Sequence, residues 1–380
     1  MTSNHTNLTI FVNNLTTFNE LDNIQVNKPI LRKHNIFRNL NDDFINGLEV
    51  IVVNDRIDIE WLSTVHDPKY LEFLSICHEN FIKSCDVAWS NGSGALVPYY
   101  FSRHIPSPNT PIYKLCGFYC MDKMTPIYVD TYENACISAN QAYNGASYLF
   151  THKAQIVYVL TSSPGHHAKY AEYGGYCFFN NAIIAATRLI ELDSEIGTDS
   201  GICANSGICA DTGIWAINDV CVDGDSPIVA ILDLDYHAGN GTFEMVKKLG
   251  LNNVLAWSIH CDPTYDYPSF EGYSDGLFNF TVGPRCEWTE YSVVLDEVCQ
   301  IITNHNIKYL IIAFGGDTFK SDPDASPLGR FELEISDYFR MGSLIKKYFT
   351  SVPILITQEG GYDMNNIGII VSSFFSGLIS

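Results

Sequence analysis

The sequence predicts an α/β protein with a wound, mostly parallel sheet flanked by helices, and three observations lead to this fold class. Short runs rich in Val, Ile and Leu alternate with stretches of helical periodicity. These runs are nearly all apolar, as expected for strands buried on both faces of a parallel sheet. Of the 380 residues, 46% are hydrophobic, which is enough for a full core. No linker rich in Pro, Gly or Ser divides the chain, so residues 1–380 are expected to form one domain.

Five apolar runs are expected to form strands of this sheet: 155–160, 228–234, 254–259, 309–314 and 353–357. The sequence also predicts the N-termini of two helices. Asp67 followed by Pro68 is typical of a helix N-terminus. The residues that follow form one apolar stripe, made of Tyr70, Leu74, Cys77 and Phe81. Asp130 with Glu133 predicts a capping box at the start of a second helix.

Composition and charge limit the class of protein. The formal net charge of −21, from 22 basic and 43 acidic residues, repels nucleic acid and favours cationic substrates. No apolar run reaches the roughly 18 residues that span a bilayer, and the N-terminus lacks a basic start and long apolar core. We therefore expect a cytoplasmic or nuclear protein without nucleic-acid or membrane partners. The 12 cysteines are scattered and include no Cys-x-x-Cys pair, which indicates reduced core thiols.

The segment at 193–226 is expected to be a low-complexity surface insertion. It contains a near-repeat over residues 200–214 and lies between a predicted helix and a predicted strand. Connections of this kind usually have only a few residues. Residues 191–226 also hold eight acidic residues and no Lys or Arg, so part of the net charge is local.

The run at 231–242, ILDLDYHAGNGT, carries the strongest chemical signal. Alternate side chains of a strand share one face, so Asp233, Asp235 and His237 can point the same way. Asp235 and His237 would then be two ligands of a catalytic zinc, with a third ligand from elsewhere and one position open for water. The alternative is a buried strand whose polar end is satisfied by neighbouring backbone.

Polar clusters follow the other predicted strands as well. His166 and His167 follow the first, a Ser-Ile-His run beginning at Ser258 ends the third, Asp317 follows the fourth, and Tyr362 follows the fifth. The carboxyl ends of parallel strands meet at one edge of the sheet, where ligands of open α/β sheets bind. The sequence therefore predicts an active site at this edge.

The motifs SPGHHA, GGYCFFNN, DLDYHAGNGT, GGDTFKSDP and QEGGY resemble those of the histone deacetylase superfamily, specifically its acetylpolyamine amidohydrolase branch. They occur in the expected order from about Val65 to the C-terminus, whereas residues 1–60 and 193–226 match poorly. The resemblance implies a single-domain arginase/deacetylase-like fold. It also implies a metal-dependent deacetylase that removes acetyl groups from N-acetylated amines, either acetylpolyamines or acetyl-lysine, and releases acetate. One Zn²⁺ per chain, or Fe²⁺ in its place, and a homodimer are part of the same expectation.

The resemblance also implies roles for individual residues. The zinc ligands are expected to be Asp235, His237 and Asp317. The acid/base pair is expected to be His166 and His167, and Tyr362 is expected to hydrogen-bond the scissile carbonyl. The channel for the acyl-amine stem is expected from Gly175, Tyr176 and Tyr267.

Supporting groups follow from the same resemblance. Asp233 and Asn240 are expected to support His166 and His167 respectively. A structural K⁺ is expected at Asp233, Asp235 and Ser258, together with the main-chain carbonyls of His237 and Ile259. Ala238 and Gly316 depart from the family pattern, in which a second histidine and a bulkier residue are common, but neither change removes a catalytic group.

Two rival functions are weighed against this one. The first is a catalytically silent, deacetylase-like module that binds acetylated ligands, and the intact set of site residues argues against it. The second is a ureohydrolase with two manganese ions, which needs more bridging ligands than the chain offers.

The residues of the expected rim bear on substrate choice. The expected rim at 90–121 holds Arg103 and Lys114 but no acidic residue, and the nearest acid is Asp122. We therefore expect acetylpolyamines to be deacetylated with only a modest preference over acetyl-lysine.

Overall fold

The computed structural model describes residues 8–13, 28–44, 47–84, 94–102, 104, 106–153, 155–199, 229–269 and 279–380. Its centre is an eight-stranded sheet with the strand order β2-β1-β3-β8-β7-β4-β5-β6. All neighbouring strands pair in parallel. The strands are β1 (Leu8–Val12), β2 (Leu48–Val52), β3 (Ile156–Val159), β4 (Val229–Asp233), β5 (Val254–Cys261), β6 (Asn279–Val282), β7 (Tyr309–Phe314) and β8 (Ile354–Gln358).

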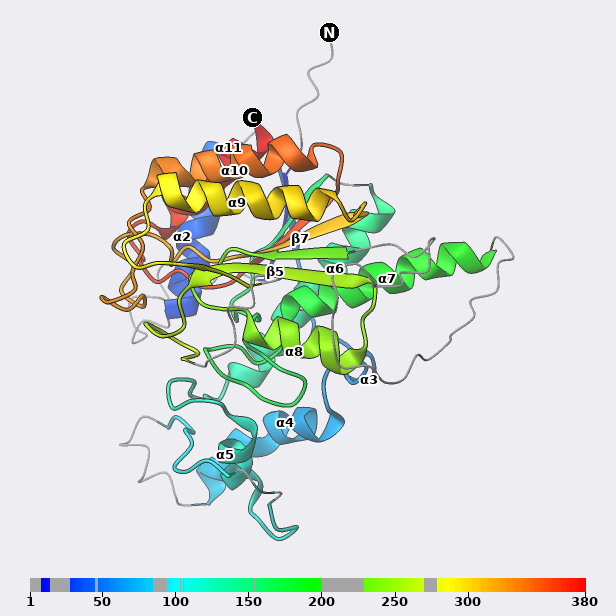
Figure 1. The fold of residues 1–380 in the computed structure, drawn as a ribbon. Helices are drawn as coiled ribbons and strands as arrows, with labels where there is room; N and C mark the ends of the chain where they lie inside the picture. The colour runs from blue at the N-terminus through cyan, green and yellow to red at the C-terminus, as the bar shows by residue number, and fades with distance from the viewer. Residues whose placement is uncertain are drawn as a thin grey trace, which may run out of the picture.

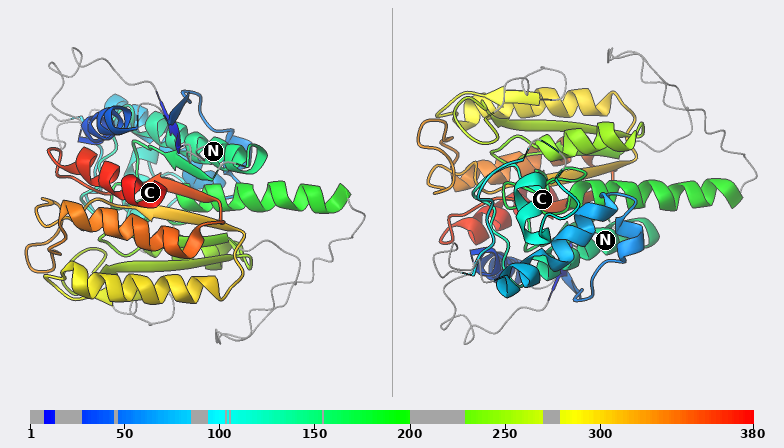
Figure 2. Two further views of the ribbon diagram at one scale, coloured as in Figure 1. Left: turned by 90° about the horizontal axis from the view of Figure 1, so that it is seen from above. Right: turned by 90° about the horizontal axis from the view of Figure 1, so that it is seen from below.

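Helices cover both faces of the sheet (Figures 1 and 2). One layer holds α2 (Lys28–Asp43), α9 (Trp288–Thr303), α10 (Ile335–Phe349) and α11 (Ile367–Ile379). The opposite layer holds α4 (Pro68–Lys83), α6 (Thr131–Thr151), α7 (Asn181–Asp199) and α8 (Asn240–Leu249). Short helical segments complete the fold: α3 (Ile59–Leu62), η2 (Ile112–Leu115) and α5 (Cys116–Tyr119).

The apolar strands are explained by this two-layer packing. In β4, Ala230 and Leu232 pack in the layer of α9 and α10, whereas Val229 and Ile231 pack in the layer of α6 and α7. Because every side chain of such a strand is buried, the sequence shows a continuous apolar run rather than an alternating pattern. Eight cysteines lie in the described residues, and all are free and buried.

The predicted fold class is confirmed, and the five predicted strands occur with ends shifted by up to two residues. Three further strands, β1, β2 and β6, were missed by the sequence analysis. β2 lies at the sheet edge and is partly exposed, and β6 has only four residues, so neither gives a strong apolar signal. β1 is a short buried run in an Asn- and Thr-rich part of the chain.

The predicted start of α4 is confirmed, because the side chain of Asp67 accepts hydrogen bonds from the backbone N–H groups of Lys69 and Tyr70. The predicted capping box of α6 is wrong. The helix begins at Thr131, but the side chain of Asp130 makes no capping hydrogen bond. The carboxylate of Glu133 instead pairs with the guanidinium of Arg56, a long-range contact that the local sequence does not reveal.

Most of the predicted insertion at 193–226 lies outside the described residues. Its first residues belong to the end of α7, which projects beyond the body of the molecule (Figure 2). Among the described helices, none has both the length and the apolar character to cross a membrane.

A buried histidine just before α4 contacts the segment that follows β3. This contact makes a testable contribution to the stability of the fold. His66 is fully buried; its Nδ1 lies 3.2 Å from the carbonyl of Lys169, and its Nε2 accepts a hydrogen bond from the Asn180 N–H at 3.1 Å. This arrangement requires the neutral ring. Burial accordingly lowers the pKa of His66 to about 4.

We expect His66 to make the protein sensitive to acid. The folded-state pKa lies below the unfolded value of about 6.5, so its contribution is complete above pH ~6.5 and is lost as the pH falls toward 4. Between pH 7 and pH 5 the loss is about 2 kcal/mol. Urea unfolding at both pH values is the measurement, and His66→Gln should show a smaller pH-dependent difference than the wild type. Equal differences in the two proteins would contradict this role.

Candidate metal centre and active site

Loops that follow five strands meet at the carboxyl edge of the sheet and enclose a cavity of about 160 Å³. Its walls include His166 and His167 after β3, His237 after β4, Tyr267 after β5 and Tyr362 after β8. Asp317, from the loop after β7, lies at the same cavity. The edge predicted from the sequence is therefore the place where these side chains gather.

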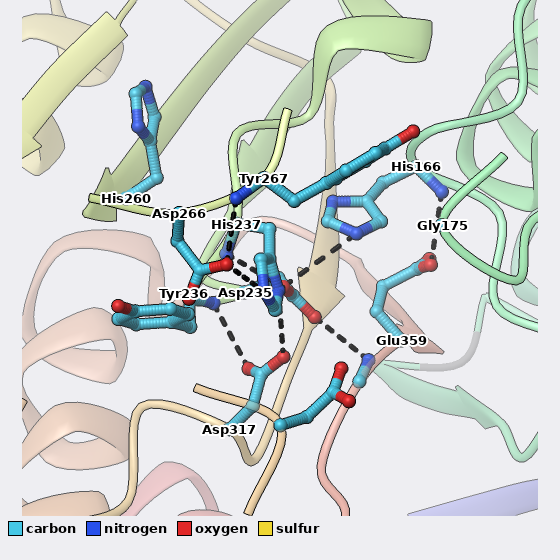
Figure 3. Close-up of polar contacts among 12 residues, drawn as sticks. His166, Gly175, Asp235, Tyr236, His237, His260, Asp266, Tyr267, Asp317 and Glu359 are labelled. Atoms are coloured by element: carbon cyan, nitrogen blue, oxygen red, sulfur yellow. Dashed lines mark hydrogen bonds and ion pairs between the residues drawn. The ribbon is translucent and has the colours of Figure 1, made fainter. Parts of the chain in front are cut away.

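Asp235, His237 and Asp317 form a buried group whose ligand atoms all lie within 4.8 Å of one another (Figure 3). The Nδ1 of His237 lies 3.1 Å from Oδ1 of Asp235 and 3.3 Å from Oδ2 of Asp317. The other oxygens of the two carboxylates accept backbone hydrogen bonds. Oδ2 of Asp235 accepts from the Gly360 N–H at 2.8 Å, and Oδ1 of Asp317 accepts from the Tyr236 N–H at 3.0 Å. The remaining ligand atoms thus converge on one point.

The same group fits a divalent cation electrostatically. Oδ2 of Asp317 is buried without a hydrogen-bond partner, which is rare for a carboxylate oxygen. Burial and the nearby Asp235 raise the pKa of Asp317 to about 8, because two adjacent buried carboxylates repel each other. A cation bound between two carboxylates and an imidazole removes this repulsion, and this donor set suits a borderline metal such as zinc. The donor set is therefore consistent with a metal site.

Glycines allow the backbone to pack directly against these carboxylates. A Cβ atom at Gly360 would lie 2.2 Å from Oδ2 of Asp317, and one at Gly315 would lie 2.2 Å from Oδ2 of Asp235. Neither position can hold a side chain without displacing a candidate ligand. Gly316, which departs from the family pattern, has the side chain of Ile367 in the space that a larger residue would need.

The tandem histidines have different electrostatic environments. Nδ1 of His166 lies 3.0 Å from Oδ2 of Asp233, and Nδ1 of His167 lies 2.7 Å from Oδ1 of Asn240. Burial alone lowers the pKa of His166, but the carboxylates of Asp235 and Asp233 raise it to about 10. Burial and the adjacent His166 hold the pKa of His167 well below its usual range. The neighbouring groups thus shift the two rings in opposite directions, His166 toward the cationic form and His167 toward the neutral form.

Glu359 supports the turn that carries the histidines, a role that the sequence analysis did not assign. Its Oε2 accepts hydrogen bonds from the backbone N–H groups of Gly165 and His166 at 2.5 and 3.1 Å. Its Oε1 accepts from the Thr357 hydroxyl at 2.8 Å. Glu359 also lies close enough to His166 and Cys177 to form a second metal-like group, but these hydrogen bonds already explain its burial. The sequence does contain a signal for this role of Glu359, because an acidic residue stands between a buried strand and two glycines.

The expected channel residues lie at the cavity. Gly175 has φ of +52°, and a Cβ there would lie 2.2 Å from Cδ2 of His167. The Tyr267 ring packs edge-on against His167, with centroids 4.7 Å apart, and the Tyr176 ring lies 5.8 Å from that of Tyr362. Tyr176 itself has φ of +64°, a strained conformation for a residue with a side chain. The hydrogen bond from the Gly175 N–H to Oδ2 of Asp122, at 2.7 Å, holds this turn.

The structure also brings acidic side chains to the cavity that sequence reasoning missed. Asp266 and Asp324 line it together with Asp122. Among the described residues, no lysine or arginine lines this cavity. The missed acids occur in loops that follow β5 and β7, which had already been assigned to the active edge. The predicted rim residue Arg103 lies outside the described residues.

The predicted potassium ligands include Asp235 and His237 of the metal group, and the others lie on the adjacent strands β4 and β5. Asp233 and Ser258 are register partners on these adjacent strands. Asp235 donates its backbone N–H to Oδ1 of Asp233 at 3.1 Å. The potassium site stays a prediction. His260 has no assigned role; its Nδ1 bonds the Cys261 carbonyl at 2.8 Å, and its ring points away from the metal group (Figure 3).

This fold and site define a class of protein. It is an α/β protein with a buried Asp-His-Asp group at the carboxyl edge of a parallel sheet. The chain matches the model of the histone deacetylase domain over residues 28–196 and 214–378, and it belongs to this family. The resemblance predicted from the motifs is therefore confirmed.

Individual relatives agree with this membership. The chain is 32% identical to acetylpolyamine amidohydrolase 2 of Pseudomonas aeruginosa, over 86% of this chain and 88% of that protein. It is 29% identical to acetylpolyamine amidohydrolase of Mycoplana ramosa, over 87% of each chain. The crystal structure of acetylpolyamine aminohydrolase from Burkholderia pseudomallei shares the fold, with a TM-score of 0.74, 23% identity and 98% of both chains covered.

Proposed function

We propose that this protein is a metal-dependent amidohydrolase that removes acetyl groups from N-acetylated amines, with acetylpolyamines and acetyl-lysine as the substrate classes. The observation that carries the proposal is the convergence of Asp235, His237 and Asp317 beside the two tandem histidines in one cavity. Membership of the histone deacetylase domain family supports the same activity, as do relatives named for acetylpolyamine hydrolysis. Zn²⁺ is the proposed metal, with Fe²⁺ as the alternative.

The proposed metal ligands are Asp235, His237 and Asp317. A divalent metal held by these three side chains would supply a Lewis acid to polarise the amide carbonyl and to make the attacking water more acidic. The neutral His167 is the proposed general base, since its depressed pKa leaves the ring free to accept a proton from the attacking water. The cationic His166 is the proposed source of the proton that the leaving amine needs.

Tyr362, Tyr176 and Tyr267 have the other proposed roles. The Tyr362 hydroxyl is the proposed hydrogen-bond donor to the carbonyl oxygen as negative charge develops there. Tyr176 and Tyr267 form the proposed walls for the alkyl stem and exclude water from the reacting amide. Asp233 and Asn240 orient the two histidine rings through the hydrogen bonds to Nδ1.

Two measurements on the purified protein test this function. Elemental analysis is expected to give about one Zn²⁺ or Fe²⁺ ion per chain. In turnover assays, the protein is expected to release acetate from N-acetylputrescine and from an acetyl-lysine peptide. A metal-loaded protein that binds acetylated amines but releases no acetate would support the silent binding module instead. Two metal ions per chain would support the ureohydrolase.

We also propose that the protein forms a homodimer through the loop at 90–121. The described part of this loop exposes large apolar side chains: Val97, Tyr99, Tyr100 and Phe101, with exposed fractions of 40, 76, 52 and 42%. Exposed apolar groups of this kind are typical of interaction surfaces. Light scattering at micromolar concentration should give twice the 42.5 kDa of one chain.

A variant and its control localise the dimer contact. Tyr99→Glu should shift the particle toward a single chain, because a charged side chain is disfavoured in an apolar interface. Val293→Glu, at a similarly exposed position on α9, should leave the mass unchanged. A wild-type particle of 42.5 kDa would refute the dimer.

A further inference from the structure

The hydrogen-bond partner of His167 is a side chain that can present either of two ends. Nδ1 of His167 lies 2.7 Å from Oδ1 of Asn240. An amide has an oxygen that accepts and an NH₂ group that donates, and the two ends have nearly the same shape. If the oxygen faces the imidazole, the proton of the neutral ring is on Nδ1, and if the NH₂ group faces it, the proton is on Nε2. The orientation of the Asn240 amide therefore decides which nitrogen of His167 is basic.

The far end of the Asn240 amide contacts the thioether of Met121. Nδ2 of Asn240 donates to Sδ of Met121 at 3.8 Å. A thioether sulfur accepts weakly and has no proton to give. The observed orientation of the amide therefore makes two hydrogen bonds, one with His167 and one with the sulfur, whereas the reversed amide would turn its oxygen toward the sulfur and keep only one. Asn240 is buried, so an unpaired end of its amide is costly.

The sulfur of Met121 is held in place by the surrounding backbone. The Met121 N–H donates to the carbonyl of Tyr173 at 2.9 Å, and the Tyr173 N–H donates to the carbonyl of Tyr119 at 2.8 Å, so the two segments run side by side. A Cβ atom at Gly174 would lie 2.8 Å from Cε of Met121. The methyl end of Met121 thus packs against the same turn whose next residue, Gly175, contacts the His167 ring. The position of the sulfur follows from these contacts and does not depend on Asn240.

We propose that Met121 is a positioning residue, whose sulfur fixes the Asn240 amide with its oxygen toward His167 and so keeps the proton of the neutral His167 ring on Nδ1. With Nδ1 occupied by Asn240, Nε2 is the basic nitrogen that is left for the cavity that His167 lines. The proposal rests on the proposed function, in which His167 is the general base, and it adds the residue that selects the ring form able to act. A ring with its proton on Nε2 has no lone pair there to take a proton from the attacking water.

The first test removes the sulfur and keeps the volume of the side chain. Met121→Leu has a similar size but offers no acceptor. It should lower kcat/KM for N-acetylputrescine by about three- to tenfold, the effect of one ordinary hydrogen bond, with the loss on kcat rather than KM. Met341→Leu makes the same change at a buried position of α10, outside the cavity, and should leave both constants unchanged. An unchanged kcat in Met121→Leu would remove Met121 from this role.

A double-mutant cycle separates orientation of the amide from packing. In the Asn240→Asp background both ends of the side chain are oxygens, so either one accepts from His167 and no orienting contact is needed. Met121→Leu should therefore lower kcat/KM by less than about twofold in this background. Equal losses in the two backgrounds would make Met121 a packing residue only and would overturn the inference.

A second measurement does not depend on turnover. The nitrogen NMR shifts of the His167 ring, assigned by comparison with His167→Gln, show which ring nitrogen carries the proton. In the wild type, Nδ1 should have the shift of a protonated nitrogen and Nε2 that of an unprotonated one. In Met121→Leu the two shifts should move toward each other, and in Met341→Leu they should stay as in the wild type.

The NMR result also distinguishes failure of this inference from failure of the proposed function. If the metal-loaded wild type releases no acetate, the proposed function fails, whereas the shifts of His167 still decide the role of Met121. Unchanged shifts in Met121→Leu would overturn the inference whether or not the protein turns over a substrate.

Discussion

Replacing Asp317 with alanine is expected to remove most of the bound metal and abolish hydrolysis while leaving the chain folded. The described residues offer three ligand side chains at this point, Asp235, His237 and Asp317. Losing one of them leaves two ligands and less negative charge to balance a divalent ion. Oδ2 of Asp317 accepts no hydrogen bond and is the oxygen that faces Nδ1 of His237 at 3.3 Å, so the substitution removes a candidate ligand atom directly.

The fold should survive this change. The alanine leaves the buried Tyr236 N–H without its acceptor, which costs about 1–3 kcal/mol. It also ends the burial of the Asp317 carboxylate and its repulsion with Asp235, the two effects that raise the pKa of Asp317. A domain of this kind has about 5–15 kcal/mol of stability. Asp317→Asn serves as a second variant, since it keeps an acceptor for Tyr236 and loses only the charge.

The measurements separate loss of metal from loss of structure. Elemental analysis should give well under one ion per chain for Asp317→Ala, with a circular dichroism spectrum like that of the wild type. A chelator should lower the Tm of the wild type, because bound metal stabilises the folded state, and should hardly change that of the variant. The exposed Asp42→Ala is the matched control and should behave as the wild type. Full metal occupancy in Asp317→Ala would remove Asp317 from the site.

The residues of the site that could be predicted are those that lie close together in the sequence, within a single loop after a single strand. Asp235 and His237 follow a buried strand at alternate positions, and the tandem histidines follow another, so their common edge follows from parallel pairing alone. The third ligand and the hydroxyl donor came from the family resemblance, since no local pattern connects Asp317 or Tyr362 to the run at 231–242.

The parts that could not be predicted depend on contacts between distant segments. The rim position of Asp324 and Asp266 follows from how the loops after β7 and β5 meet, shown by the hydrogen bond from the Ser326 N–H to Asp266. The failed capping box has the same origin, because Glu133 pairs with Arg56 instead of the helix N-terminus. Local propensity is a weak guide wherever tertiary contacts compete for the same side chain.

Tyr362→Phe is expected to keep the fold and the metal and to lose about 10²- to 10³-fold in turnover, the usual effect of removing one oxyanion donor. The substitution removes only the hydroxyl. The backbone N–H of Tyr362 still donates to Oδ2 of Asp322 at 2.6 Å, and the ring can still pack beside the Arg32 guanidinium, 5.6 Å from its centroid. The turn before Tyr362 passes through Gly361, whose φ of +113° is rarely adopted by residues with side chains, so the shape of this turn does not depend on the hydroxyl.

The protonation state of Tyr362 sharpens this prediction. Burial and the neighbouring Asp324 hold its pKa well above the usual range, so the hydroxyl stays protonated and able to donate throughout the neutral range. The loss in Tyr362→Phe should therefore be the same at pH 7 and pH 9, and should fall on kcat more than on KM because the donor acts mainly on the developing charge. Tyr128→Phe, at an exposed position, is the control and should retain full turnover. If Tyr362→Phe keeps its turnover within a factor of about three while its metal content is unchanged, the tyrosine does not stabilise the transition state.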